Sequence, residues 1–147
     1  MGNWYRILLA DDIVSDEMTY GSMKDIRTGR FILIDGIPCR VVEIETSAPG
    51  KHGAAKMRIT AVGVFDGAKR TLLKPSDADS EIPIIAKKKA QVVSLSENRV
   101  QLMDSESFET FEVNIPAEMK DALKPGTEVE MLSYGESRAI SRILSNV

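Results

Sequence analysis

A lysine set among glycines is the residue of this sequence best placed to do chemistry. Lys51 and His52 stand between Gly50, which follows Pro49, and Gly53. Because proline and glycine favour turns that other residues avoid, the pattern predicts a hairpin tip that presents the Lys51 amine. Such an amine can bind an anion or accept a covalent group, and binding residues concentrate on loops held by a rigid scaffold. The alternative is a solvated surface lysine with no further role.

The sequence lacks the residues that most enzymes use. His52 is the only histidine and Cys39 the only cysteine, so a zinc site built from such ligands is excluded. A Ser-His-Asp triad would need His52, which has no orienting acid in its glycine-rich segment. A phosphate-binding loop would need a glycine in place of Glu45 and a hydroxyl residue in place of His52. We predict a protein that is not an enzyme and has no catalytic residue, metal or cofactor.

Positive charge is concentrated around the same lysine. Residues 46–75 contain six basic side chains and one acidic one, a net charge of +5, so the rest of the chain carries −8 of the total of −3. A basic segment on an acidic body favours local contact with phosphates over coating of nucleic acid by the whole surface. The alternative is a solvated strand face with alternating lysines.

The sequence predicts a cytoplasmic protein with no membrane partner. No apolar run approaches the roughly 18–20 residues that a membrane span needs. The apolar stretch Met1–Ala10 is too short for a span, and Asp11 and Asp12 follow it in place of a cleavage site, so we expect no secretion signal. A single cysteine fits a reducing compartment.

The elements that must position Lys51 are strands and turns. Asp35-Gly36 is a strong signal for a hairpin turn after the apolar run Phe31–Ile34. Residues 55–65 predict a long strand with Met57, Ile59 and Ala61 on one face, and Asp66-Gly67 predicts the next turn. Residues 75–81 are predicted to form a polar loop. The Lys51 loop therefore joins two strands of a small β-domain.

The second half of the chain restarts the pattern as three strands, a short helix and two strands. Pro116 is expected to open that helix, predicted over Ala117–Leu123. This order and size suit a five-stranded barrel of the oligonucleotide-binding (OB) type; the alternative is a small barrel without a ligand. We predict an N-terminal extension over residues 1–18, a first domain over 19–84 and a second over 85–147.

The segment Ser47–Lys56 closely resembles the modification loop of the hypusine-containing translation factors, initiation factor 5A of archaea and eukaryotes. The flanking segments Asp35–Glu43 and Phe65–Lys69 are similar to the strand and the hairpin that this family places around the loop. The resemblance extends from about Thr19 to the end of the chain. It implies an all-β fold in which an SH3-like barrel precedes the OB-fold barrel and its one short helix.

The resemblance also implies a function. In the family, deoxyhypusine synthase transfers an aminobutyl group from spermidine to the lysine that matches Lys51, and some lineages then add a hydroxyl to give hypusine. The family binds the ribosome beside the peptidyl-tRNA and promotes slow peptide bonds: the first bond, those in proline runs, and the step of termination. The modification roughly doubles the reach of the lysine and adds a second basic nitrogen, which suits contact with a tRNA acceptor end or rRNA.

Several residues take roles by this resemblance. The loop around the modified Lys51 comprises Ser47, Pro49, Gly50, His52, Gly53, Ala55 and Lys56. The basic side chains expected to add RNA contacts are Lys56, Arg58, Lys69 and Arg70. Many family members have a lysine where this chain has Ala48, and that difference puts one RNA contact in doubt.

Two other functions remain open from the sequence. An unmodified RNA-binding module that uses the second barrel predicts that Lys51→Arg is harmless. An enzyme with a reactive lysine predicts a depressed lysine pKa in a pocket rather than an amine on an exposed tip.

Overall fold

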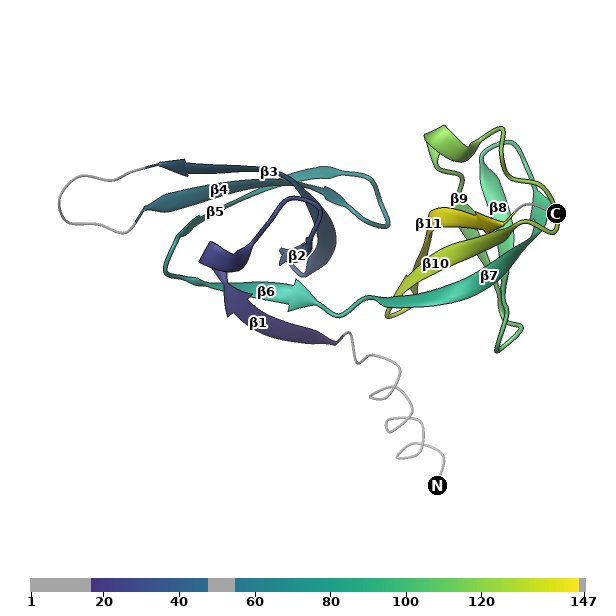
Figure 1. Ribbon diagram of the computed structural model, residues 1–147, viewed down its shortest axis with the longest axis horizontal. Helices are drawn as coiled ribbons and strands as arrows, with labels where there is room; N and C mark the ends of the chain where they lie inside the picture. The colour runs from purple at the N-terminus through teal and green to yellow at the C-terminus, as the bar shows by residue number, and fades with distance from the viewer. Residues whose placement is uncertain (1–16, 48–54, 146–147) are drawn as a thin grey trace, which may run out of the picture. The chain divides into compact units, whose positions relative to one another are not determined.

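The structure is a computed structural model that describes residues 17–47 and 55–145 (Figure 1). The chain divides into two compact units, one ending at Ile84 and the other beginning at Ile85. Both are built almost entirely from β-strands, which confirms the predicted all-β class. Each unit has its own hydrophobic core, so each is described by itself.

The first unit is the SH3-like barrel. A four-stranded antiparallel sheet has the order β2-β3-β4-β5, and β1 pairs separately with β6. The strands are β1 (Met18–Ser22), β2 (Phe31–Ile34), β3 (Ile37–Ser47), β4 (Lys56–Gly63), β5 (Lys69–Pro75) and β6 (Asp79–Pro83), and one 3-10 turn, η1 (Met23–Asp25), follows β1. Strands β3 and β4 lie side by side (Figure 1), and β5 accompanies β4 to the same end, where Lys56 pairs with Ser47 on one side and with Pro75 on the other.

Local sequence explains the frame of this unit. Asp35 and Gly36 both have positive φ, 53° and 77°, so the predicted turn between β2 and β3 is confirmed. The alternation predicted for residues 55–65 is also confirmed, because β4 buries Met57, Ile59 and Ala61 while Lys56 and Arg58 face solvent. The buried side chains of the core are Met23, Ile26, Ile32, Ile34, Cys39, Val41, Met57, Ile59 and Ala61.

One strand pair escaped the sequence interpretation. Residues 75–81 were expected to be a loop, but β6 begins at Asp79 and pairs with β1. This short strand has no recognisable sequence pattern, because it begins with the polar residues Asp79, Ser80 and Glu81. Its stability comes from a partner strand more than fifty residues away in the sequence. Strand β1 begins at Met18, and the carbonyl of Glu17 accepts a hydrogen bond from the Ile84 N–H at 2.9 Å. The rest of the predicted extension lies outside the described residues.

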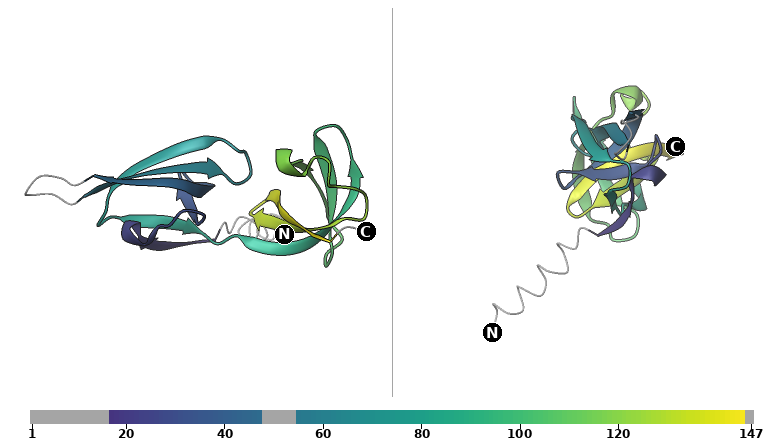
Figure 2. Two further views of the ribbon diagram at one scale, coloured as in Figure 1. Left: turned by 45° about the horizontal axis from the view of Figure 1, so that its top comes forward. Right: turned by 90° about the vertical axis from the view of Figure 1, so that its left-hand side faces the viewer.

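The second unit has the predicted OB-fold topology. Its strands are β7 (Ala86–Leu95), β8 (Arg99–Asp104), β9 (Thr110–Asn114), β10 (Glu128–Tyr134) and β11 (Ser137–Ser145), in the order β11-β10-β7-β8-β9. Contacts between β11 and β9 bring the two edges of this sheet together, and the green to yellow strands curl accordingly (Figure 2). The buried core is Ala90, Val92, Val100, Leu102, Val113, Leu123, Val129, Met131 and Ile140.

The predicted helix over Ala117–Leu123 was too long. Only Ala117–Met119 is helical, as the 3-10 turn η2, and Pro116 is its N-cap residue. The N–H groups of Met119 and Ala122 donate to carbonyls three residues earlier, at 2.9 Å each, which is the tighter 3-10 spacing. Leu123 is buried, the Lys124 carbonyl accepts from the Thr127 N–H in a turn, and the Gly126 N–H donates to the Val92 carbonyl of β7, so little length is left for an α-helix.

Candidate functional site

The β3–β4 hairpin holds the two ends of the predicted modification loop. Strand register pairs Ser47 with Lys56, and the Ser47 hydroxyl donates to the Lys56 carbonyl at 3.4 Å. The Ala55 carbonyl accepts a hydrogen bond from the Ser76 N–H at 2.7 Å, which ties the same end of the hairpin to the β5–β6 connection. The segment that contains Lys51 therefore leaves and re-enters the domain at one anchored position.

The predicted loop residues are only partly within the described structure. Ser47, Ala55 and Lys56 lie at the end of the hairpin stem. The remaining predicted members lie outside the described residues: Pro49, Gly50, Lys51, His52 and Gly53, together with Ala48. The modification of Lys51 thus stays a prediction at this stage.

Two of the four predicted RNA-contact residues lie at the loop end of the sheet. Lys56 and Arg58 are exposed and alternate with buried residues of β4, so they share the outer face of the sheet. Arg58 stands across from Glu45 on β3 and from Leu73 on β5. Within the described residues, no carboxylate oxygen lies within 4.0 Å of either cation. Both side chains are therefore available to an external phosphate.

The other two predicted RNA-contact residues lie at the opposite end of the β4–β5 hairpin. Register places Lys69 opposite Val62 and Arg70 opposite Ala61. Six residues separate Lys56 from Val62 along β4, which corresponds to about 20 Å of strand. The structure therefore splits the predicted set of four cations into two pairs, and one phosphate group cannot contact both pairs at once.

Arg70 already has an internal partner. Its Nη2 and Nη1 donate to the two carboxylate oxygens of Asp66 at 2.8 and 3.1 Å, and the Ala68 N–H donates to the same carboxylate at 3.0 Å. The hydrogen bond from Arg70, helped by the Ala68 N–H, lowers the pKa of Asp66 to about 2. Arg70 fixes the turn between β4 and β5 through these bonds.

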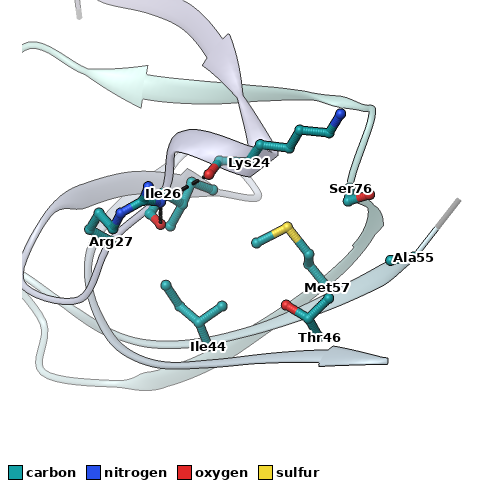
Figure 3. A pocket seen from close by; sticks show the side chains of 8 residues that line it. All are labelled: Lys24, Ile26, Arg27, Ile44, Thr46, Ala55, Met57 and Ser76. Carbon is teal, nitrogen blue, oxygen red and sulfur yellow. Dashed lines mark hydrogen bonds between the residues drawn. The ribbon is translucent and has the colours of Figure 1, made fainter. Parts of the chain in front are cut away.

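A pocket of about 360 Å³ opens on the inner side of the loop end, beside the stem of the hairpin. Ile26, Ile44 and Met57 point into it, and the Lys24 side chain stretches along its edge toward Ser76 (Figure 3). Thr46, Ala55 and Arg27 complete the lining, which holds two cations and no carboxylate. The pocket combines an apolar floor with a positively charged rim.

Lys24 and Arg27 were missed by the sequence interpretation. Arg27 Nη1 donates to the carbonyls of Lys24 and Ile26, both at 2.9 Å, which fixes the guanidinium at the rim. The Ser22 hydroxyl caps η1 by accepting from the Lys24 N–H at 3.3 Å. No local pattern marks these cations, because they lie in and just after η1, about twenty residues before the end of β3 that they approach in the fold.

The described part of the chain offers little support for other site types. No group of three or more His, Cys, Asp or Glu side chains in residues 17–47 and 55–145 is placed to hold a metal ion. Cys39 is fully buried, and burial raises the pKa of its thiol, so it is a core residue and a poor nucleophile. Among the helices of this part, none is long and apolar enough to cross a bilayer.

Comparisons with known proteins point to one family. Residues 18–78 match the family model described as "Translation initiation factor 5A-like, N-terminal". Translation initiation factor 5A of Methanopyrus kandleri is 52% identical over 120 residues, which cover 80% of this chain and 88% of the relative. The same factor of Thermoplasma acidophilum is 50% identical over 122 residues, 83% and 92% of the two chains. A solved structure of translation initiation factor 5A from Methanococcus jannaschii has a TM-score of 0.74 and 34% identity, covering 87% of this chain and 98% of that one.

Proposed function

The chain belongs to the translation initiation factor 5A family, and we propose that it acts on the ribosome beside the peptidyl-tRNA through a deoxyhypusine or hypusine side chain on Lys51. The family consists of translation factors, not enzymes, and the chain is one of them. The proposed work is to promote peptide bonds that form slowly: the first bond, bonds in proline runs, and the termination step. It takes place in the cytoplasm, where the chain would meet ribosomes and deoxyhypusine synthase.

The observation that carries the proposal is the anchored hairpin stem together with the loop sequence. Ser47 and Lys56 are paired, and Lys51 lies midway between them in the sequence, in a segment that resembles the family's modification loop. A paired stem is a rigid base for a group that must reach a distant ligand, since a loop on a fixed scaffold loses less entropy on binding. Lys56 and Arg58 on the outer face can add phosphate contacts near that base.

The chemistry proposed for the modified lysine is positional. An aminobutyl extension with two basic nitrogens can contact phosphate and sugar oxygens of the acceptor end and hold it in place. Holding two reactants in geometry lowers a barrier without any acid–base residue in the protein. The aminobutyl group comes from spermidine and is attached covalently to Lys51, so the proposal requires no separate cofactor.

The direct test is mass spectrometry of the Lys51 peptide from protein purified from its own host. A mass gain equal to one aminobutyl group, with or without one oxygen, is the expected result and identifies which form is made. Protein from a bacterium that lacks the modifying enzyme is the control and should carry an unmodified peptide. An unmodified Lys51 throughout the host's population would overturn the proposal in favour of the plain RNA-binding module.

A further inference from the structure

We propose that the pocket at the loop end binds one nucleotide of a single-stranded RNA, with the base against Ile26, Ile44 and Met57 and the phosphate on Lys24 and Arg27. The inference rests on the proposed function, because it names a second contact that the same hairpin base makes with RNA. It differs from the predicted contacts at Lys56, Arg58, Lys69 and Arg70, since none of those residues lines the pocket.

The floor of the pocket suits a flat, apolar group. Its volume of about 360 Å³ lies within the range of small-molecule sites, about 300–1,000 Å³. Ile26 and Met57 are only 5% and 6% exposed, so the rest of the core supports them from behind. A methionine sulfur makes favourable contacts with an aromatic ring, often at its edge, and the two isoleucine side chains add apolar surface. Every nucleobase offers such a face, so the floor predicts binding without strong sequence preference.

The rim suits an anion. Lys24 and Arg27 both line the pocket, and the described residues place no carboxylate oxygen within 4.0 Å of either. Only one nitrogen of the Arg27 guanidinium is used by the two backbone carbonyls, so its remaining donors can bind phosphate oxygens. Fixing an arginine in advance reduces the entropy lost when it binds a phosphate.

The third side of the pocket is polar. Thr46 and Ser76 bring hydroxyl groups to the edge near Ala55 (Figure 3). A hydroxyl can donate or accept, so these groups match the ribose 2′-OH and the edge of a base. An apolar floor, a cationic rim and hydroxyls between them together correspond to the three parts of a nucleotide. A purely apolar peptide would leave Lys24 and Arg27 without a partner.

The test measures the pocket directly by NMR with methyl labels on isoleucine and methionine. The probe is a fluorescein-labelled single-stranded RNA of about ten nucleotides, and the protein carries unmodified Lys51. A base seated on the floor should shift the methyl signals of Ile26, Ile44 and Met57 through its ring current. The same RNA made without bases should bind more weakly, as fluorescence anisotropy of the label measures, and should leave these methyl signals unshifted. Equal affinity for the abasic RNA, or unmoved methyl signals at saturation, would overturn the proposal.

Two variants sharpen the measurement. Lys24→Gln removes one phosphate contact from an exposed side chain, so the slope of log affinity against log salt should fall by about 0.7 and the affinity by about five-fold. Lys120→Gln makes the same charge change at an exposed site of the second unit and should alter neither. Thr46→Phe, at an exposed position on β3, should fill the pocket mouth and abolish the methyl shifts while the melting temperature holds. Wild-type behaviour of both pocket variants would refute the assignment.

The experiments distinguish failure of the pocket proposal from failure of the proposed function. The binding assay uses unmodified protein and reads only the pocket, whereas the peptide mass reads only Lys51. A modified Lys51 with a pocket that ignores RNA overturns the pocket alone. An unmodified Lys51 with methyl shifts in the pocket overturns the modification alone.

Discussion

The two ends of the β4–β5 hairpin carry similar basic residues with opposite consequences. At the loop end, Lys56 and Arg58 face solvent, and Lys24 and Arg27 line a pocket with no acid in its wall. At the turn end, Arg70 is bound by the Asp66 carboxylate, which also caps the Ala68 N–H. A positive charge therefore indicates a binding site only where the fold leaves it without an internal anion. Arg70 at the turn end stabilises the scaffold, whereas the described residues give Lys56, Arg58, Lys24 and Arg27 at the loop end no acid partner within 4.0 Å.

The largest expected effect is functional and comes from the loop end. Lys51→Arg keeps the charge but removes the amine that we propose as the acceptor of the aminobutyl group, since a guanidinium is a different nucleophile. We expect at least about a ten-fold loss of translation through a proline-run reporter, with the melting temperature nearly unchanged. The measurement is a reporter assay in the protein's own host with the variant as its sole copy, and a reporter without prolines serves as the control. Normal proline-run synthesis by the variant would break the mechanism.

The next effect in size is structural and comes from the turn end. A Cβ on Gly63 would collide with the Asp66 carboxylate and lie 2.9 Å from the Arg70 guanidinium. We expect Gly63→Ala to lower the free energy of unfolding by about 1–2 kcal/mol, because the carboxylate must leave its hydrogen bonds to make room.

A double-mutant cycle isolates this collision. Asp66→Ala removes the carboxylate, so adding Gly63→Ala to it should cost little more, as urea unfolding of the four proteins will measure. Additive losses in the double variant would show that Gly63 matters for a reason other than Asp66.

The sequence predicted the turns and the strand alternation of this hairpin, but it did not predict the pocket at the loop end. Asp35-Gly36, the alternation along β4 and the Asp66-Gly67 turn are local signals, and the structure bears them out. The pocket is different, because its lining comes from η1, β3, β4 and the β5–β6 connection and exists only after tertiary folding. The split of the four predicted cations also depends on strand register, which composition does not contain.

A smaller effect concerns pH and again belongs to the turn end. The pKa of Asp66 is lowered from 3.8 to about 2 in the folded protein. The unfolded chain therefore binds the proton more readily, so the stabilisation is fully present above about pH 4 and is lost as the pH falls toward 2. Because the Asp66 side chain is 46% exposed, we expect the loss to be at most about 1 kcal/mol.

Asp66→Asn is the matched variant for this pH effect. It keeps an acceptor for the Ala68 N–H but cannot titrate, so its unfolding midpoint should change less than that of the wild type between about pH 5 and pH 2.5. Asp104 of the second unit also has a lowered pKa, because the N–H groups of Glu106 and Ser107 donate to its carboxylate. The unfolding midpoint of the variant is therefore still expected to fall somewhat at acid pH. An equal fall in the variant and the wild type would show that Asp66 does not contribute to the acid sensitivity.

The smallest expected effect compares one exposed lysine from each end. Lys56→Gln and Lys69→Gln make the same charge change on the same face of the sheet, about 20 Å apart along the hairpin. If the loop end is where RNA is bound, Lys56→Gln should weaken binding of a short single-stranded RNA by about two-fold and lower the salt slope by about 0.7, while Lys69→Gln leaves both nearly unchanged. Fluorescence anisotropy over a series of salt concentrations measures both quantities. Equal losses of RNA affinity in the two variants would mean that RNA contacts the whole outer face of the hairpin. Lys69 would then belong to the binding surface, and only Arg70 would distinguish the turn end from the loop end.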